Sequence, residues 1–350
     1  RAKKVWMVCD SRTDISRSGE ESRYIKQLEM HFGAEVKRHV FSAGIVSNAG
    51  SGSQSVAKTD DMLSKMHEHA ISASSLQNYI VCPAKFLYAN VERLTPEKEV
   101  EESLDAAKTG TVFHLTMEAL YKGMTEVTDT YLRSVKDEWI KAEVDKHIVE
   151  VMNCLEVTGR NLVLKSMIVR YVRQTIRREL ELMASYGVHR FSILGVEKPL
   201  NGTLGNFRFY GVADRIDSFN GRDIRIVDYK TGRVLDSDLE VNDDNAEKVV
   251  KALFEGKYAQ KPKIALQLYL YDRFIPEEYK GKNVINSVYQ PQSLFRSPIP
   301  EVKVSRKFKD LMKESIGKVL EEMDDKNVPF RRTSDEEACK YCDFKDICGR

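Results

Sequence analysis

The sequence of 350 residues contains no apolar run long enough to cross a lipid bilayer, and we expect no secretory signal, because the opening apolar run of residues 5–9 is too short for one. It also lacks internal repeats, low-complexity tracts and a G-x-x-x-x-G-K-[ST] loop, so we expect no ATP hydrolysis by this chain. The formal net charge is only +2, so a polyanion would have to be attracted by local basic clusters. We expect a soluble, cytoplasmic chain. Because it starts without Met, we also expect the natural protein to extend further at its N-terminus.

The apolar pattern changes along the chain from a helical period to an alternating one. We expect residues 1–57 to be the end of a preceding α/β region followed by a linker, and residues 58–350 to form one domain. Within this domain, about 58–187 is predicted to be mainly helical and about 188–300 to form a sheet core. Residues 301–350 are predicted to hold a last helix and a cysteine-bearing tail. The fold class is therefore α/β, with a mixed central sheet flanked by helices.

Alternation predicts three successive strands in the core, at 192–200, 207–219 and 223–230. Asn201-Gly202 and Asn220-Gly221 are typical hairpin turns between such strands. The elements predicted to follow are a helix at 264–274, a strand at 283–289 and a helix at 308–323.

Two acids and a lysine surround the second of these hairpins. Asp214 lies among aliphatic residues, where a carboxylate ionises with difficulty unless a cation or hydrogen bonds compensate it. Asp228 ends the next strand, and Lys230, two residues later, lies on the same side of an extended chain. Two carboxylates can bind a hard divalent cation. A cation beside a fixed positive charge suits phosphodiester hydrolysis, because both stabilise the developing negative charge.

These acids also have ordinary interpretations. Asp214 could form a structural salt bridge with Arg215 or Arg225. Asp217 is a rival ligand on the same strand, but its odd spacing from Asp214 puts it on the opposite face. The combination with Lys230 favours a site, because a purely structural scaffold has no need for a lysine beside two acids.

Four further residues are candidates for the same site. His114 opens a helix after a glycine-bearing turn, although a lone histidine is ordinarily a surface or core group. Glu197 lies in an apolar strand before the hairpin, where it could also be an edge-strand charge. Gln267 and Tyr271 are four residues apart on one helix face, a spacing that packing at the border of the core also explains.

The six cysteines are Cys9, Cys82, Cys154, Cys339, Cys342 and Cys348. Three of them crowd into the last dozen residues, and nothing indicates an oxidising compartment, so a metal or cluster site is favoured over disulfides. Four thiolates suit a [4Fe–4S] cluster or structural zinc equally, and the C-x2-C spacing of Cys339 and Cys342 alone favours zinc.

Together, these residues resemble the PD-(D/E)XK nuclease superfamily, and within it the RecB-like branch. That branch has a helical His, an Asp on one strand, an Asp/Glu-x-Lys on the next strand, and Gln-x-x-x-Tyr on a following helix. The matching positions are His114, Asp214, Asp228-Tyr229-Lys230 and Gln267-Leu-Tyr-Leu-Tyr271. The resemblance covers roughly residues 70–350. It implies a restriction-endonuclease-like core with a large helical insertion and a cysteine-stapled C-terminal tail.

The resemblance implies a Mg²⁺ or Mn²⁺ ion whose ligands are Asp214, Asp228, His114 and the carbonyl of Tyr229. Lys230 would stabilise the attacking hydroxide or the pentavalent phosphate. The supporting residues would be Glu197, Gln267 and Tyr271.

The split spacing of Cys82 against Cys339, Cys342 and Cys348 resembles the iron–sulfur staple of AddB-type helicase–nucleases and of CRISPR-associated nucleases of this branch. It favours a [4Fe–4S] cluster over zinc, in the role of a clamp. The segment 19–24 resembles the helicase-like region that precedes an AddB-type nuclease. The implied partners are therefore a helicase region of the same polypeptide and an AddA-type helicase–nuclease subunit.

The activity implied is that of a metal-dependent DNA exonuclease acting on single-stranded ends in double-strand-break repair and recombination. The basic residues expected to line the DNA channel are Arg170, Arg173, Arg177 and Arg332. The alternatives are a CRISPR-type spacer-processing nuclease and a catalytically inactive DNA-binding scaffold. A zinc-stapled DNA-binding module would explain the cysteines, but it leaves the two acids and the lysine unexplained.

Overall fold

The computed structural model describes residues 13–14, 17–18, 23–39, 55–95, 103–296 and 298–349. The chain divides into two compact units, Arg1–Gly52 and Ser53–Arg350. The described elements of the first unit are β1 (Thr13–Asp14), β2 (Arg17–Ser18) and α1 (Arg23–Phe32). Most of the helicase-like segment 19–24, and Cys9, lie outside the described residues.

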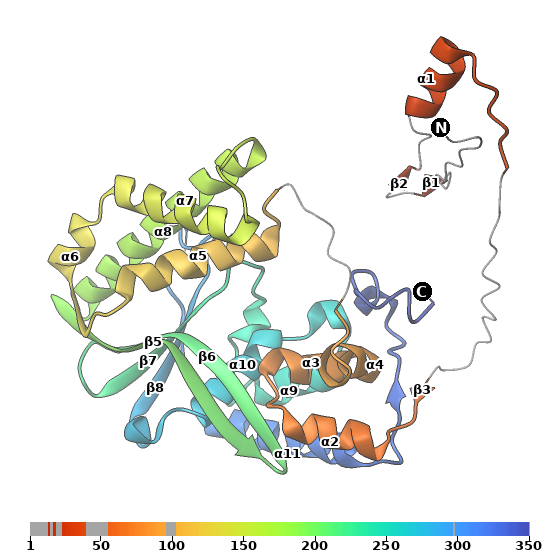
Figure 1. The fold of residues 1–350 in the computed structure, drawn as a ribbon. Helices are drawn as coiled ribbons and strands as arrows, with labels where there is room; N and C mark the ends of the chain where they lie inside the picture. The colour runs from red at the N-terminus through yellow and green to blue at the C-terminus, as the bar shows by residue number, and fades with distance from the viewer. Residues whose placement is uncertain are drawn as a thin grey trace. The chain divides into compact units, whose positions relative to one another are not determined.

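The second unit is built around a six-stranded mixed sheet, drawn in green and blue in Figure 1, with the order β4-β5-β6-β7-β8-β9. Its strands are β4 (Glu126–Thr128), β5 (Arg190–Leu204), β6 (Phe207–Ser218), β7 (Asp223–Tyr229), β8 (Asn283–Tyr289) and β9 (Glu301–Val302). Strands β7 and β8 pair in parallel, and the other neighbouring pairs are antiparallel. Residues 224–229 of β7 are all buried, the charged Arg225 and Asp228 included, because both faces of this central strand are covered.

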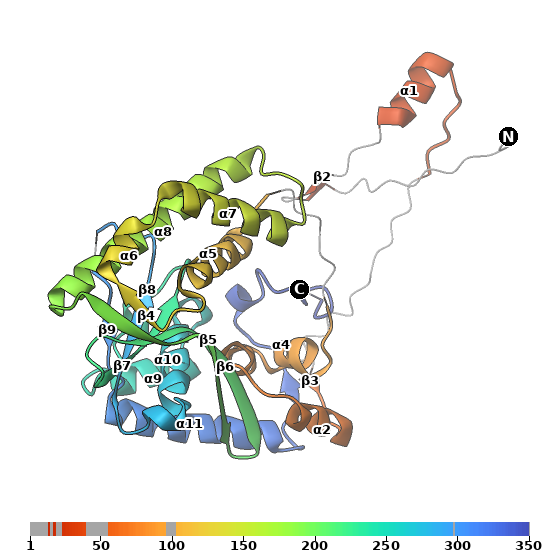
Figure 2. The same cartoon turned by 60° about the vertical axis from the view of Figure 1, so that its left-hand side comes forward.

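Helices cover both faces of the sheet and give three layers (Figures 1 and 2). One face is covered by α5 (Ala106–Tyr121), α7 (Asp137–Met152) and α8 (Arg160–Ser185), whose apolar side chains form a core with β5, β7 and β8. The other face is covered by α9 (Ala246–Glu255), α10 (Lys263–Arg273) and α11 (Arg306–Asp324). The short α6 (Asp129–Ser134) follows β4.

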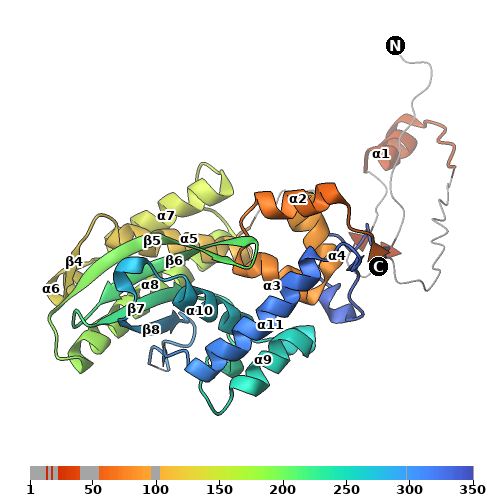
Figure 3. The ribbon, with the colours of Figure 1, turned by 90° about the horizontal axis from the view of Figure 1, so that it is seen from below.

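The two ends of this unit come together beside the second helical layer. The helices α2 (Asp60–Glu68), α3 (Ala73–Val81) and α4 (Pro83–Phe86) pack in the same core as α11, as Figure 3 shows from below. Strand β3 (Ser55–Val56) pairs with β10 (Phe330–Arg331), so the start of the unit is joined to its C-terminal tail. A π-helix follows α4, and the short 3-10 helices of this unit are Asp236–Asp238, Tyr258–Gln260, Glu277–Tyr279 and Glu336–Ala338.

The predicted α/β class is confirmed, as are the main elements from β6 to α11. The hairpin turn predicted at Asn201-Gly202 is wrong, because β5 continues through both residues to Leu204 and turns at Gly205, which has φ +56°. Gly202 serves packing instead: a Cβ there would lie 1.9 Å from the ring of Phe274. Strand β4 was also missed within a region expected to be helical. No helix in the described part of the chain meets the length and apolarity needed to span a membrane.

Candidate active site

The site forms where β6 and β7 separate. The two strands pair over 215–217 and 225–227, and Asp214 and Asp228 lie just beyond the last pair. There the backbone N–H of Tyr229 donates to Oδ2 of Asp214 at 2.6 Å, in place of a bond to the neighbouring strand. On its other side, β7 stays paired with β8, and the N–H of Lys230 donates to the carbonyl of Tyr289 at 2.8 Å. The fork therefore brings Asp214, Asp228 and Lys230 together, as the sequence predicted.

Asp228 is buried, and its two carboxylate oxygens differ in their partners. Oδ1 lies 2.9 Å from Nζ of Lys230, 3.0 Å from Nε2 of Gln267 and 3.1 Å from the hydroxyl of Tyr271. Oδ2 lies 2.7 Å from the same lysine nitrogen but accepts no hydrogen bond of suitable geometry from the described residues. One oxygen is thus saturated with donors, and the other keeps a lone pair for a further partner.

His114 and Glu197 lie beside Asp214. Helix α5 brings Nδ1 of His114 to 3.2 Å from Oδ1 of Asp214. Glu197 follows an irregularity in the pairing of β5 with β6 and has φ +47°, a backbone conformation that costs a non-glycine residue energy. Such strain at a carboxylate beside another acid is typical of a functional site rather than of an edge-strand charge.

The carboxylates of the site repel each other. Burial raises the pKa of Asp228, and the charge of Asp214 raises it further against the opposing effect of Lys230. Burial and Asp214 likewise raise the pKa of Glu197. Burial would lower the pKa of His114, but its hydrogen bond to Asp214 and the surrounding carboxylates raise it overall. Burial first, and the charge of Asp214 after it, thus make ionisation of Asp228 and Glu197 less favourable than in water.

Helix α10 carries Gln267 and Tyr271 to this point. The hydroxyl of Tyr271 lies 2.8 Å from the carbonyl of Val212 and is also hydrogen-bonded to Gln267, so one side-chain pair links α10 to both strands. The start of α10 is held by the buried Asp238, whose Oδ1 accepts from the N–H of Ile264 at 2.7 Å. Sequence reasoning missed Asp238. Asp238 lies 25 residues before α10 in a short 3-10 helix, so no local pattern links it to that helix.

The donor set suits a hard divalent cation, because carboxylate oxygens are its usual protein ligands. Among the described residues, no three His, Cys, Asp or Glu side chains are arranged to hold a metal ion by themselves. Mg²⁺ does not need such a cage, since it commonly binds one or two carboxylates and keeps its other positions for water and phosphate. Asp214 and Asp228, with the unbonded Oδ2 of Asp228, meet this requirement. The expected four-ligand set that includes His114 and Tyr229 remains a prediction.

The four cysteines of the predicted staple line one cavity of about 210 Å³. Cys82 ends α3, while Cys339, Cys342 and Cys348 come from the tail. Burial raises the pKa of the Cys348 thiol, and neighbouring Cys82 raises it further. The thiols thus lie near one another, but they do not form a metal-binding group among the described residues. The structure accordingly gives no support of its own for a cluster or a zinc ion.

The four arginines expected in a DNA channel do not line a common cavity. Arg173 and Arg177 line a groove on α8, whereas Arg332 lines the cysteine cavity and donates to the carbonyl of Cys348. Arg173 donates to the carboxylate of Asp137, with Nε at 2.8 Å from Oδ1. The guanidinium of Arg170 lies over the ring of Phe295, and Arg177 pairs with Glu181.

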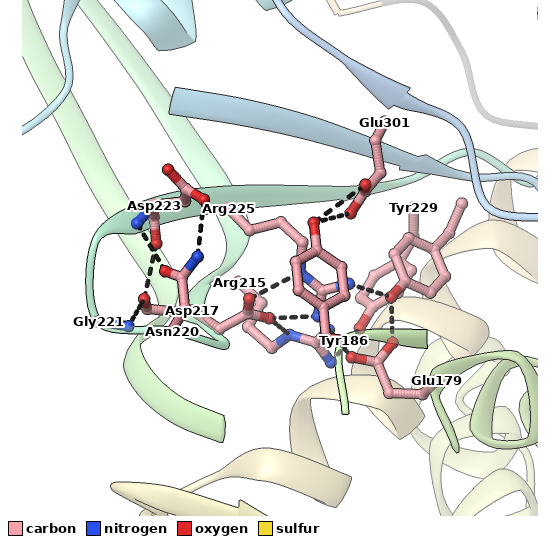
Figure 4. A network of polar contacts seen from close by, with 12 residues as sticks. Glu179, Tyr186, Arg215, Asp217, Asn220, Gly221, Asp223, Arg225, Tyr229 and Glu301 are labelled. Carbon is pink, nitrogen blue, oxygen red and sulfur yellow. Dashed lines mark hydrogen bonds and ion pairs between the residues drawn. The ribbon is translucent and has the colours of Figure 1, made fainter. Parts of the chain in front are cut away.

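Behind the site, β6 and β7 carry a second group of charges, shown in Figure 4. Arg215 and Arg225 bind Asp217 through Nε at 2.7 Å each, and both also bind Glu179 of α8. We call these four residues the buried network. Neither arginine pairs with Asp214, so the structural salt bridge considered for that acid is not formed. Asp217 faces away from the site, as its spacing predicted.

The network also touches the site strand itself. Nη1 of Arg215 donates to the hydroxyl of Tyr229 at 3.3 Å, and Nη1 of Arg225 donates to that of Tyr289 at 3.0 Å. Tyr289 donates in turn to Glu179. Because Tyr229 lies between Asp228 and Lys230, the network fixes the strand that carries two residues of the site.

Comparisons with known proteins bear on the same region. Residues 70–349 match the family model of the PD-(D/E)XK nuclease superfamily. No curated protein matches the chain. Among solved structures, protein VC1899 from Vibrio cholerae aligns at 11% identity with a TM-score of 0.16. That alignment covers 76% of this chain and 58% of the other, so this chain spans less than two thirds of that protein's length.

Members of the matched superfamily are generally nucleases that act on nucleic acid, usually with Mg²⁺ or Mn²⁺. The match includes all the candidate residues described above, from Cys82 through His114 and the strand fork to Cys348. By this match, the chain belongs to the PD-(D/E)XK nuclease superfamily.

Proposed function

We propose that the second unit is a DNA nuclease that depends on Mg²⁺ or Mn²⁺. The observation that carries this proposal is the buried carboxylate of Asp228, which keeps one oxygen without a hydrogen bond beside Asp214 and Lys230. A buried acid in this state is stabilised most by a cation, and the matched superfamily usually uses one.

The cation, when bound, would orient water and offset the negative charge that develops on the phosphate. Asp214 and Asp228 would hold it, with His114 and the carbonyl of Tyr229 as further donors. Gln267 and Tyr271 occupy Oδ1 of Asp228, which would leave Oδ2, now ion-paired with Lys230, as the oxygen that binds the metal.

Lys230 supplies the fixed positive charge of the site. Its ammonium group already lies 2.7 Å from Oδ2 of Asp228, so a small movement would bring it to an oxygen of the reacting phosphate. There it would stabilise the charge of the transition state more than that of the bound substrate. Glu197 would complete the acidic side of the site.

In finer terms, we propose an exonuclease on single-stranded ends, of the RecB-like branch, that acts in double-strand-break repair. The link from Gln267 and Tyr271 to Asp228 supports the branch, because those two residues belong to its pattern. In this proposal, residues 1–57 are the end of a helicase-like region of the same polypeptide, residues 58–350 are the nuclease domain, and an AddA-type subunit is the partner.

The cysteine tail would act as a clamp in this proposal. Cys82, Cys339, Cys342 and Cys348 would hold a [4Fe–4S] cluster, or alternatively zinc, and so join α3 to the C-terminus. This part of the proposal rests on the resemblance of their spacing, and the four cysteines line one cavity. Iron, sulfide and zinc analysis of anaerobically purified protein tests it. Four irons and four sulfides per chain favour the cluster, and one zinc per chain favours the alternative. Protein that contains neither iron nor zinc would contradict both forms of the clamp.

The experiment for the nuclease is nucleotide release from labelled single-stranded DNA in Mg²⁺, in Mn²⁺ and with chelator. The native chain is compared with Lys230→Ala and with Lys282→Ala, a matched control just before β8 at the far end of the parallel strands. We expect metal-dependent cleavage that Lys230→Ala abolishes and Lys282→Ala retains. DNA binding by the folded native chain without cleavage would favour the inactive scaffold instead.

A further inference from the structure

A cavity of about 390 Å³ opens directly beside the proposed reaction centre. Lys230, Gln267 and Tyr271 form part of its wall, so any group bound in it lies next to the reacting phosphate. Its size is within the range of small-molecule sites, roughly 300–1,000 Å³, and is far more than a metal ion needs. We call it the base cavity. The proposed metal site does not account for it.

The base cavity has aromatic and aliphatic walls. Phe209 of β6 and Phe274, which follows α10, lie with ring centroids 5.7 Å apart at 30° and are joined by Leu200 and Leu270. Gly202 permits this wall, because any side chain there would collide with the Phe274 ring. Tyr210 also belongs to the lining of the cavity, and 47% of its surface is exposed.

The charged groups of the base cavity are all of one sign. Lys230 and Lys263 are its charged residues, and no carboxylate lines it among the described residues. The hydroxyl-bearing Ser72 and Ser74 and the amide of Gln77 complete the lining. These walls fit a ligand with a flat apolar part and a negatively charged group. A nucleotide has both, because its base stacks on aromatic rings and its phosphate binds lysine.

We propose that the base cavity receives the base and sugar of the nucleotide adjoining the phosphate that is cleaved. This inference rests on the proposed nuclease and narrows its substrate. A base inside a duplex is stacked and paired, so it reaches such a cavity only from a single strand or after leaving the helix. The walls offer stacking surfaces, which a base of any type can use.

The test scans a labelled single strand with one abasic tetrahydrofuran nucleotide, moved one position at a time, and measures kcat/KM in Mg²⁺. For the native chain, we expect cleavage to fall by roughly 5- to 150-fold when the abasic position adjoins the scissile phosphate, which is the range of base–aromatic stacking. Other positions should have little effect. A profile without any such position would overturn the inference while leaving the nuclease intact.

Substitution of the exposed ring assigns the effect to the base cavity. We expect Tyr210→Ala to weaken the position-specific effect of the abasic nucleotide at least about threefold, corresponding to part of one stacking contact. Tyr210→Phe should retain the effect. Asn201→Ala is the matched control, because Asn201 pairs with Tyr210 across the hairpin but does not line the cavity. An unchanged profile in Tyr210→Ala would place the base elsewhere.

A measurement without catalysis separates this inference from the nuclease itself. If the native chain cleaves no strand, binding of thymidine 5′-monophosphate and of 2-deoxyribose 5-phosphate is compared by saturation-transfer NMR. We expect the nucleotide to bind through its base protons, the sugar phosphate to bind at least about tenfold more weakly, and Tyr210→Ala to remove this difference. Equal binding of the two probes, or no loss in Tyr210→Ala, would contradict the base cavity whatever the nuclease assay shows.

Discussion

Strands β6 and β7 carry two groups of charged side chains that differ in how well their charges are balanced. In the buried network, two acids face two arginines, and each arginine binds both acids. At the strand fork, three acids lie near one lysine and one histidine. The first group is fully enclosed, whereas the second opens onto a cavity.

The pKa directions express this difference. Burial would raise the pKa of Glu179, but Arg215 and Arg225 lower it overall, so this acid gains by being ionised in the folded chain. The pKa of Asp228 is raised, so this acid loses by being ionised there. Removing one partner from a balanced buried group is costly, whereas a carboxylate with a raised pKa beside a cavity is a candidate for a functional site. The comparison separates the balanced charges of the buried network from the charges of the proposed site on the same strands.

The substitution Asp228→Asn is expected to have the largest effect, a loss of DNA cleavage. Replacing this carboxylate with an amide removes a cation ligand, so we expect the rate to fall by about 10³-fold or more. Single-turnover cleavage of single-stranded DNA measures it. The control is Asp223→Asn at the other end of β7, which should retain activity. Equal activity of the two variants would remove Asp228 from the site.

Replacing a carboxylate with an amide in the buried network should lower the stability of the fold. Glu179→Gln leaves two arginines with one acid in an enclosed space, so we expect the free energy of unfolding to fall by about 3–5 kcal/mol. Urea unfolding measures it. Glu181→Gln, on the same helix but exposed, should change it by less than about 1 kcal/mol. Similar small changes in both variants would mean that the network contributes little.

Asp228→Asn should change stability in the opposite direction from Glu179→Gln. Because the unbalanced carboxylate is removed, we expect the chain without divalent cation to gain on the order of 1 kcal/mol. Thermal unfolding in chelator measures this gain, which excess Mg²⁺ should reverse in favour of the native chain. Destabilisation by Asp228→Asn would show that Lys230 already balances this acid.

The buried network also predicts a pH dependence. Since the folded pKa of Glu179 is lowered, its contribution to stability is present above the ordinary carboxyl value of about 4.3 and is lost as the pH falls through the lower folded value. Urea unfolding between about pH 3 and 6 should therefore show that the free energy of unfolding falls more steeply with decreasing pH in the native chain than in Glu179→Gln. Parallel curves would contradict this assignment.

The smallest effect is expected for the predicted DNA channel. If Arg173 contacts DNA phosphate, Arg173→Ala should weaken binding and reduce the salt slope by at most about one ion. Its present partner, Asp137, would have to release it first. Fluorescence anisotropy at several salt concentrations measures this change. An unchanged slope would remove Arg173 from the channel.

Much of the site was predictable from the sequence because its residues lie on regular elements with fixed spacing. The period of a strand places Lys230 on the same side as Asp228 and turns Asp217 away from Asp214, and the structure has both features. The separation of β6 from β7 was not predictable, because it depends on where pairing stops. Because the strands separate there, the backbone N–H of Tyr229 donates to the carboxylate of Asp214.

The remaining errors come from tertiary contacts that local patterns do not contain. Asn201-Gly202 has the composition of a turn, but the glycine is needed to pack Phe274 against the strand. Glu179 has the pattern of an ordinary helix residue, and only packing of α8 on the sheet pairs it with Arg215 and Arg225. Arginines on α8 suggested a DNA channel, yet in the structure their partners are local acids and an aromatic ring.

The most direct test of the proposed cation site is Mn²⁺ binding to the intact chain, followed by electron paramagnetic resonance in the absence of DNA. We expect that the native chain binds Mn²⁺ and that Asp214→Asn and Asp228→Asn each weaken this binding at least about tenfold. Lys230→Ala should retain or strengthen the binding while it abolishes cleavage. Mn²⁺ binding that is unchanged by both aspartate substitutions would show that the unbalanced acids at the strand fork are not a cation site.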